Sequence, residues 1–135
     1  MEQVMEQEKT ILVVEDEEAL QEAIQTKLKK QGKYRVLSAL SAEEALGVLV
    51  KDTPDLVWLD LLLPGMGGFQ FLSNLRSTPQ WRNLPVVIVS VSGTPEKIQR
   101  AFELNVIDYI VKSQYKLEDI IRRVGDVITG LGSEK

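Results

Sequence analysis

Five short apolar runs alternate with segments of helical periodicity, and this alternation restricts the fold more than any other feature of the sequence. Most of the runs are continuous and rich in β-branched residues, which is typical of strands covered on both faces of a sheet. The fifth run is less regular because Asp108 interrupts it. The predicted strands are Ile11–Val14, Tyr34–Leu40, Leu56–Leu59, Val86–Val89 and Val106–Val111.

The segments between and after these runs carry apolar residues at the three- and four-residue spacing of amphipathic helices. Ser41 and Glu44 form a capping-box pattern at the start of the second segment. Thr94-Pro95 places a cap and a first-turn proline before the fourth, and Gly32 is a natural stop for the first. The apolar positions are Leu20, Ala23, Ile24 and Leu28; Ala45, Leu46 and Leu49; Phe69, Leu72 and Leu75; Ile98, Ala101 and Phe102; and Leu117, Ile120, Ile121, Val124 and Ile128.

Regular alternation of strand and helix predicts parallel strands joined by right-handed crossovers. We therefore expect an α/β fold, a doubly wound five-stranded parallel sheet of order 2-1-3-4-5 between two helical layers, in the flavodoxin-like (βα)5 arrangement. A closed eight-stranded barrel would need about 250 residues, whereas the chain has 135. In an open sheet of this order, ligands bind at the carboxyl ends of the strands, next to the switch point between the first and third strands.

The length is that of one domain. Residues 1–9 are predicted to be a flexible N-terminal tail, residues 10–130 the folded domain and residues 131–135 a C-terminal tail. No effector domain is visible, so either the protein acts alone through protein contacts or the sequence is part of a longer chain.

Composition excludes several classes of chemistry. The sequence has no cysteine and no histidine, which removes disulfides, thiol chemistry, histidine metal sites and Ser-His-Asp catalysis. A net charge of −4 and a pI of about 4.9 argue against nucleic acid or an anionic membrane as the partner. No apolar run approaches the length of a membrane-spanning helix, and the acidic N-terminus is unlike a secretory signal. The expected location is the cytoplasm.

Charged and hydroxyl side chains follow four of the predicted strands. Glu15 and Asp16 follow the first strand, and Asp60 follows the third. Ser90 ends the fourth and Lys112 the fifth. The first and third strands are neighbours, so the carboxylates should converge, and two of them about 4 Å apart repel by about 4 kcal/mol at an effective dielectric constant of 20. Such a cluster needs a proton or cations: Lys112 supplies one charge, and Mg²⁺, which takes oxygen ligands, would supply more.

Each of these residues taken alone has an ordinary structural explanation. Acidic residues suit the start of a helix, and an aspartate at a strand end often forms a turn. A lysine there usually extends its ammonium into water, and a serine often caps a helix. Their joint placement at four strand ends of one fold favours a functional site.

The ordered set of motifs resembles the receiver domain of response regulators, of the chemotaxis-regulator type, which is the phosphoacceptor part of two-component signalling. ILVVEDEEAL resembles the family's first strand and acidic pair, and DLLLPGMGGFQFL resembles its phosphoacceptor loop. LPVVIVSVSG resembles the fourth strand with its hydroxyl residue, and DYIVK the fifth strand with its lysine. The resemblance covers about residues 10–130, and the ordered set, with 30 residues from Asp60 to Ser90, is specific.

The resemblance implies that Asp60 is the phosphoacceptor, a nucleophile that becomes an acyl phosphate. It implies that Glu15 and Asp16 bind Mg²⁺ together with Asp60 and the backbone carbonyl of Leu62. In-line phosphoryl transfer depends on positioning and charge neutralisation, which such a site supplies.

The resemblance also implies how phosphorylation is sensed. Ser90 would hydrogen-bond one phosphoryl oxygen and Lys112 would pair with another, while Tyr109 turns inward as the switch aromatic. The alternative for Tyr109 is a partly buried ring that only packs. Phosphorylation would then bias the loop of residues 91–94 and the helix after it, and the output face would be the fourth helix, fifth strand and fifth helix.

The implied function is that of a single-domain response regulator receiver. It would accept a phosphoryl group from a sensor histidine kinase or a phosphotransfer protein and then change its contacts with a downstream protein. The transfer is self-catalysed, so the protein is not expected to be a turnover enzyme. Nucleic acid and membrane are not expected as partners, and homodimer formation is left open.

Five positions depart from the family pattern. One is Leu62, two residues after Asp60, which has no polar group to orient a hydrolytic water, so we expect the phosphoryl state to decay slowly. Glu15 replaces the commoner aspartate, Val91 stands where the family has a smaller residue, and Asn105 takes a turn position that favours glycine. Ser113 replaces a proline that follows the lysine in a cis bond. A cis bond costs about 2.5–4 kcal/mol without proline, so we expect a trans Lys112–Ser113 bond with a shifted start of the last helix, or else a strained cis bond.

Two rival interpretations remain. A receiver-like interaction module that is never phosphorylated is kept open by Val91 and Ser113. A phosphatase of the haloacid dehalogenase class also uses an aspartate nucleophile with Mg²⁺, but the second aspartate that it needs two residues later is Leu62 here. The sequence also lacks the phosphate-binding loops that nucleotide binding or FMN binding would need.

Overall fold

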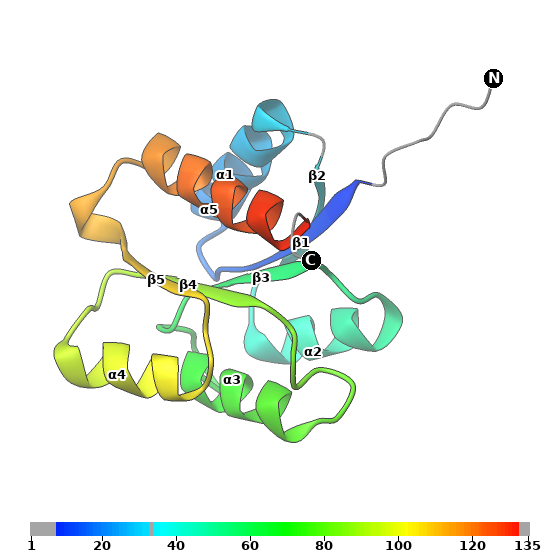
Figure 1. The fold of residues 1–135 in the computed structure, drawn as a ribbon, viewed down its shortest axis with the longest axis vertical. Helices are drawn as coiled ribbons and strands as arrows, with labels where there is room; N and C mark the ends of the chain where they lie inside the picture. Colours follow the sequence, from blue (N-terminus) through cyan, green and yellow to red (C-terminus); the bar gives the residue numbers. More distant parts are fainter. Residues whose placement is uncertain (1–7, 33, 133–135) are drawn as a thin grey trace.

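Strands and helices alternate strictly along the chain in the computed structural model, which describes residues 8–32 and 34–132 (Figure 1). The elements are β1 (Lys9–Val14), α1 (Glu18–Gln31), β2 (Tyr34–Ala39), α2 (Ala42–Lys51), β3 (Leu56–Leu59), α3 (Gly68–Ser77), β4 (Val86–Ser90), α4 (Pro95–Glu103), β5 (Asp108–Val111), a 3₁₀ turn (Lys112–Gln114) and α5 (Leu117–Gly132).

The five strands form one parallel sheet in the order β2-β1-β3-β4-β5, as predicted. The register brings the ends of the strands level with one another. Val14, the last residue of β1, lies opposite both Ala39 of β2 and Leu59 of β3, and Ser90 of β4 lies opposite Val111 of β5. The residues that follow these positions therefore leave the sheet along a single edge, which we call the carboxyl edge.

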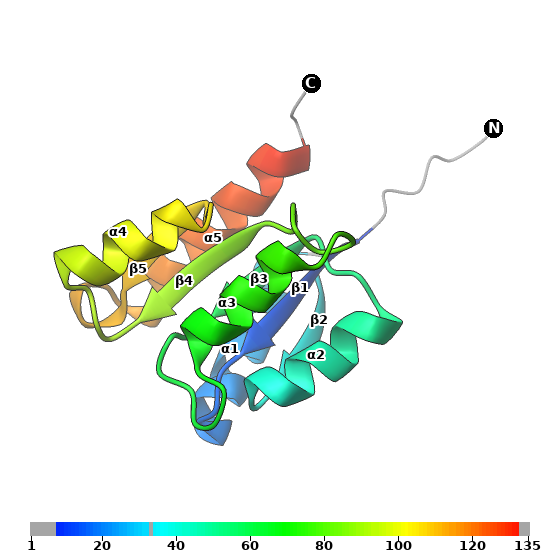
Figure 2. The same ribbon diagram turned by 90° about the horizontal axis from the view of Figure 1, so that it is seen from below.

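Helices cover both faces of the sheet and make three layers. Figure 1 shows α1 and α5 on one face and α2, α3 and α4 on the other, and Figure 2 shows the second group in front of the strands. Alternate strand residues face the two layers: Val57 and Leu59 pack with the cluster under α2 and α3, and Trp58 packs with the cluster under α1 and α5. Because the central strands are covered on both sides, β1, β3 and β4 are almost entirely buried, whereas the edge strand β2 is partly exposed. This burial explains the continuous apolar runs in the sequence.

Two strands start at a different residue from the one predicted. β1 starts two residues before Ile11, so Lys9, which was placed in the N-terminal tail, belongs to the sheet. The fifth strand starts at Asp108 and not at Val106. Asn105 has a left-handed backbone (φ 61°), and the N–H of Val106 donates to the carbonyl of Ala101 at 3.4 Å, so Val106 still belongs to the turn out of α4. The N–H of Ile107 donates to the carbonyl of Val86 at 2.8 Å and leads into the strand.

The other boundaries lie close to the predicted ones. β2 ends at Ala39, one residue early, β4 extends by one residue to Ser90, and α5 runs on to Gly132, past the predicted domain boundary at residue 130. Residues 1–7 and 133–135 of the predicted tails lie outside the described residues. No helix in the described part of the chain is both long and apolar enough to cross a membrane.

The predicted caps are present at three helix ends. Ser41 Oγ accepts a hydrogen bond from the N–H of Glu44 at 3.0 Å, while the Glu44 carboxylate accepts from the N–H of Leu40, one residue before the usual capping-box donor. Thr94 Oγ1 accepts from the N–H of Lys97 at 3.3 Å, with proline at the first helical position. Gly32 ends α1 with an extended backbone and not with a left-handed one.

Candidate functional site

Three carboxylates gather where β1 and β3 leave the carboxyl edge. Glu15, Asp16 and Asp60 each place an oxygen within 4.8 Å of the others. Glu15 is 2% exposed and Asp60 5%, whereas Asp16 is exposed. The backbone fixes this geometry because the N–H of Asp60 donates to the carbonyl of Val14 at 3.1 Å, which joins the two strand ends directly. The convergence predicted from the strand ends is observed.

Lys112 reaches the same pocket from the end of β5. Its Nζ lies 2.9 Å from Glu15 Oε1 and 3.4 Å from Asp60 Oδ2. The lysine side chain is 19% exposed, so this ion pair is largely shielded from solvent. Three carboxylates face one ammonium, and the pocket therefore has a negative excess that a divalent cation would neutralise.

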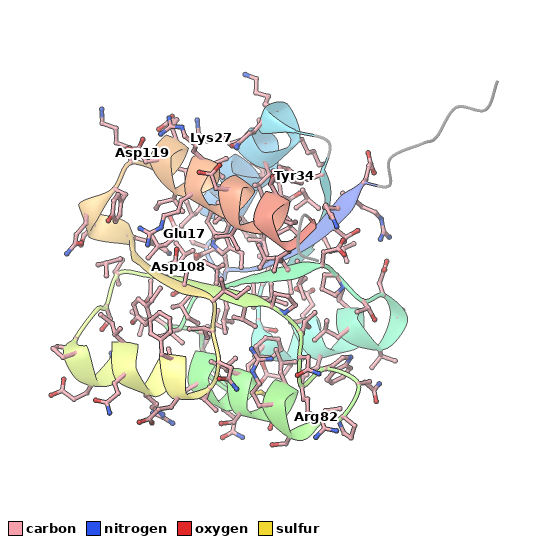
Figure 3. All side chains as sticks on the ribbon, in the orientation of Figure 1. Glu17, Lys27, Tyr34, Arg82, Asp108 and Asp119 are labelled. Carbon is pink, nitrogen blue, oxygen red and sulfur yellow. The ribbon has the colours of Figure 1, made fainter. Side chains whose placement is uncertain are left out.

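Backbone N–H groups orient both buried carboxylates. The N–H of Leu62 donates to Asp60 Oδ1 at 3.1 Å, and the N–H of Glu17 donates to Glu15 Oε2 at 3.1 Å. Figure 3 labels Glu17 where the chain passes from β1 into α1. Each acidic residue thus keeps one oxygen on a backbone donor and turns the other toward Lys112.

The pocket raises the pKa of both Asp60 and Lys112, but for different reasons. Burial raises the pKa of Asp60 to about 6, and the charge of Glu15 acts in the same direction, while Lys112 and the Leu62 N–H oppose the rise. Burial alone would lower the pKa of Lys112, but the hydrogen bond to Glu15 and the charge of Asp60 outweigh it and raise the pKa above its ordinary value. The lysine therefore stays charged at neutral pH, and the ionised form of Asp60 is disfavoured in the pocket without a further cation.

Ser90 and Tyr109 connect this pocket to the loop between β4 and α4. Ser90 is fully buried, and its Oγ accepts from the N–H of Ser92 at 3.3 Å. The Tyr109 hydroxyl donates to the carbonyl of Ser92 at 2.5 Å, and Lys97 Nζ donates to the Ser92 hydroxyl at 2.8 Å. Burial raises the pKa of Tyr109, and the charge of Asp60 adds to this rise. Three side chains thus fix Ser92, two residues after the predicted phosphate contact.

The backbone after Lys112 follows the first of the two predicted alternatives. No peptide bond among the described residues is cis, so the Lys112–Ser113 bond is trans. A 3₁₀ turn over Lys112–Gln114 follows at once, the N–H of Tyr115 donates to the carbonyl of Lys112 at 3.3 Å, and α5 begins at Leu117. Asn105, as expected, takes the left-handed conformation.

Two apolar side chains next to the site residues in sequence are exposed. Leu62, two residues after Asp60, is 49% exposed, and Val91, directly after Ser90, is 56% exposed. Both are far more exposed than is usual for large aliphatic residues in a fold whose other leucines and valines are mostly buried.

Sequence reasoning missed one polar residue that touches the site's backbone. Gln21 of α1 is only 3% exposed, and its side-chain amide lies against the carbonyls of Val13, Glu15 and Ala39. Its signal was its spacing: it lies three and seven residues before Ile24 and Leu28, on the buried stripe of the helix.

Comparison with known proteins agrees with this geometry. The family model of the response regulator receiver domain matches residues 11–125. The phosphate regulon transcriptional regulatory protein PhoB of Escherichia coli is 33% identical over 118 residues, which are 87% of this chain and 51% of the relative. The chain spans about half the length of the curated relatives that it matches, and a relative such as PhoB has further sequence outside the matched region.

Solved structures show the same fold. The phosphorylated cyanobacterial phytochrome response regulator RcpA is 30% identical with a TM-score of 0.78, and the match covers 90% of this chain and 91% of that one. The Mn²⁺-bound form of the response regulator Rcp1 is 28% identical with a TM-score of 0.75 over 88% and 91% of the two chains.

The family match, the sheet order and the pocket of three carboxylates and a lysine all lead to the same assignment. Members of this family are signalling modules that are typically phosphorylated on an aspartate and bind Mg²⁺, and they interact with histidine kinases or phosphotransfer proteins and with downstream partners. The chain belongs to the response regulator receiver domain family of two-component signalling.

Proposed function

We propose that Asp60 accepts a phosphoryl group from a sensor histidine kinase or a phosphotransfer protein. The observation that carries this proposal is the placement of the Asp60 carboxylate, buried beside an acidic pair and 3.4 Å from an ammonium group. A carboxylate oxygen would attack phosphorus as the bond from phosphorus to the donor's imidazole nitrogen breaks. Lys112, held in place by its 2.9 Å ion pair with Glu15, would pair with a phosphoryl oxygen.

The residues present fit a hard divalent cation. The donor set of Glu15, Asp16 and Asp60 consists of oxygen only, and its negative excess is not balanced by Lys112. We propose that these carboxylates, with the backbone carbonyl of Leu62, bind Mg²⁺. When bound, the ion supplies positive charge that neutralises the phosphoryl oxygens.

Ser90 and Tyr109 would report phosphorylation to the rest of the domain. The Ser90 Oγ accepts from the N–H of Ser92, and its own O–H would donate to a phosphoryl oxygen on Asp60 and draw the side chain toward that group. A movement of Ser90 would displace Ser92, which Tyr109 and Lys97 also hold, and so reach the start of α4. We therefore propose α4, β5 and α5 as the face that meets the downstream protein.

The proposal includes the narrower predictions made from the sequence. The receiver domain would act in the cytoplasm, by self-catalysed phosphoryl acceptance and without turnover of a substrate. Its output would be a change in protein contacts and not nucleic-acid or membrane binding, and homodimer formation stays open.

A receiver-like module that is never phosphorylated is the second candidate. The exposed Val91 favours it, because a branched side chain directly after Ser90 would narrow the approach to Asp60. A small phosphodonor separates the candidates. Acetyl phosphate with Mg²⁺ should add one phosphoryl mass to the wild-type protein and produce a Phos-tag shift.

The same treatment should leave Asp60→Asn unmodified. Asp55→Asn is the matched control, since Asp55 accepts from the N–H of Thr10 at the other end of β1 and should not affect labelling. A lack of any Mg²⁺-dependent labelling, together with a lack of beryllofluoride binding, would favour the interaction module.

A further inference from the structure

A buried amide lies directly behind the acidic pair, and nothing in the proposed phosphoryl transfer uses it. We infer that Gln21 is a positioning residue for the metal site: its side-chain amide holds the carboxyl end of β1 so that Glu15 and Asp16 point into the pocket. This inference rests on the proposed function, because it concerns how the proposed Mg²⁺ ligands are held.

The contacts of Gln21 leave one orientation for its amide. Nε2 lies 3.2 Å from the carbonyl of Val13, 3.2 Å from that of Glu15 and 3.1 Å from that of Ala39. Carbonyl oxygens only accept hydrogen bonds, so the NH₂ group must face all three. Oε1 points the other way and accepts from Gln25 Nε2 at 3.2 Å. With 3% of the residue exposed, water does not substitute for these contacts.

The three acceptors belong to the backbone that carries the acidic pair. Ala39 ends β2, and its carbonyl also accepts from the N–H of Glu15 at 3.1 Å, so one oxygen ties Gln21 to both strand ends. The N–H of Gln21 itself donates to the carbonyl of Glu17 at 2.9 Å. That backbone bond belongs to the first turn of α1, so the side-chain amide is what Gln21 adds at the segment Glu15–Glu17.

Repulsion gives this contact a function beyond packing. Carboxylates on two adjacent residues face a third on β3 within 4.8 Å, and the repulsion between such acidic groups favours a displaced Glu15–Asp16 segment unless its backbone is fixed. Outer groups that orient metal ligands typically change metal affinity by 10- to 100-fold when they are removed. Gln21 occupies such a place because its amide contacts the backbone carbonyl of Glu15 and not its carboxylate.

The test compares Mg²⁺ affinity with stability. Gln21→Met is close to glutamine in size but cannot donate, and we expect its Mg²⁺ dissociation constant, measured by isothermal titration calorimetry well below the melting temperature, to rise at least tenfold. Gln21→Asn keeps a polar amide that is too short to reach all three carbonyls, and it should weaken binding at least threefold even if the methionine variant does not fold.

Two controls separate positioning from general loosening. Gln25→Met removes the donor to Gln21 Oε1 but leaves the three carbonyl contacts, and Ile24→Ala destabilises the same helix from its fully buried face. Both should bind Mg²⁺ within twofold of wild type. Acetyl phosphate labelling of Gln21→Met should need at least tenfold more Mg²⁺ for half its maximal rate, with the maximal rate itself within threefold of wild type.

The outcomes distinguish the two proposals. The positioning role would be overturned if the Gln21 variants bound Mg²⁺ as tightly as wild type. It would also be overturned if Ile24→Ala weakened Mg²⁺ binding as much as Gln21→Met does. Either result would leave the phosphoacceptor proposal intact. Wild-type protein whose Mg²⁺ binding is absent, or is unchanged by Asp60→Asn, would overturn the proposed metal site itself.

Discussion

The carboxyl edge and the amino edge of the sheet differ in whether their buried polar groups have matching partners. At the carboxyl edge, Glu15 and Asp60 are buried with one ammonium between them, and the charges do not balance. At the amino edge, Arg76 of α3 ties the loops together without any carboxylate partner in the contacts described. Figure 3 shows Glu17 and Arg82 toward these opposite ends of the molecule.

Arg76 binds the two loops that precede β4 and β5 at the amino edge. Its guanidinium donates to four backbone carbonyls from two loops, at distances of 2.7 to 3.2 Å: Leu104, Arg82, Leu84 and Asn105. The loop before β4 and the loop before β5 are thereby joined to the end of α3. Four of the five guanidinium N–H donors thus have backbone acceptors.

The amino edge contributes to stability, whereas the carboxyl edge is suited to binding a cation at a cost in stability. A guanidinium that meets only carbonyls stabilises the fold at every pH in the physiological range, because neither partner titrates there. A cluster of buried carboxylates costs free energy in the folded state and is relieved when a cation binds. The predictions below change one edge at a time and expect effects of opposite sign.

The largest expected effect is at the amino edge. Arg76→Met keeps the aliphatic stem but removes the donors to four carbonyls, and we expect it to lower the free energy of unfolding by about 3 kcal/mol. Urea unfolding followed by circular dichroism measures the change. Arg122→Met is the matched control, since that side chain is 66% exposed and should cost less than about 0.5 kcal/mol. An Arg76→Met midpoint equal to wild type would show that the loops hold without this side chain.

The next effect is at the carboxyl edge and has the opposite sign. The pKa of Asp60 is raised from 3.8 to about 6, which corresponds to about 3 kcal/mol against the ionised form. Asp60→Asn removes the charge but also the ion pair with Lys112, so without Mg²⁺ at pH 7 we expect a net stabilisation of about 2 kcal/mol. Saturating Mg²⁺ should stabilise the wild type and not the variant. If the metal-free variant were no more stable than metal-free wild type, the buried carboxylate would not cost free energy in the folded state.

The same carboxylate predicts a pH dependence. Its folded-state pKa of about 6 lies above the ordinary 3.8, so between these values the folded state binds more protons than the unfolded state. The stability that protonated Asp60 contributes is complete below about pH 4 and is lost as the pH rises through 6. The advantage of Asp60→Asn over wild type, measured in urea without Mg²⁺, should therefore shrink from pH 7 to pH 5. If the stability difference between Asp60→Asn and wild type stayed constant from pH 7 to pH 5, Asp60 would not be the group that titrates in this range.

Much of the carboxyl edge could be predicted from the sequence because strand ends are marked by a change from apolar to polar residues. The run before Glu15 and the run before Asp60 are both continuous and apolar, and the parallel order then brings their ends together. The departures were also informative: the missing proline at Ser113 left a trans bond or a strained cis bond as the two alternatives, of which the trans bond is observed, and Asn105 has the left-handed backbone that asparagine tolerates.

The amino edge could not be predicted in the same way. In the sequence, Arg76 is an ordinary polar residue near the end of an amphipathic helix. Its acceptors are backbone carbonyls 6 to 29 residues away, and no residue type in the sequence identifies them. Gln21 was missed for the same reason, since all three acceptors of its Nε2 are carbonyls. Side chains that bind backbone become visible only when the fold is known.

The smallest expected effect concerns the turn that Arg76 binds. Asn105 has φ 61°, and its carbonyl accepts from Arg76 Nη2 at 3.2 Å. Asn105→Ala forces a β-carbon into this conformation and should cost about 1 kcal/mol, whereas Asn105→Gly should stay within about 0.5 kcal/mol of wild type. In an Arg76→Met background the alanine penalty should fall, because the carbonyl is no longer held and the turn can relax. A double-mutant cycle in urea measures this coupling, and strictly additive effects would show that the amino edge owes its geometry to the backbone alone.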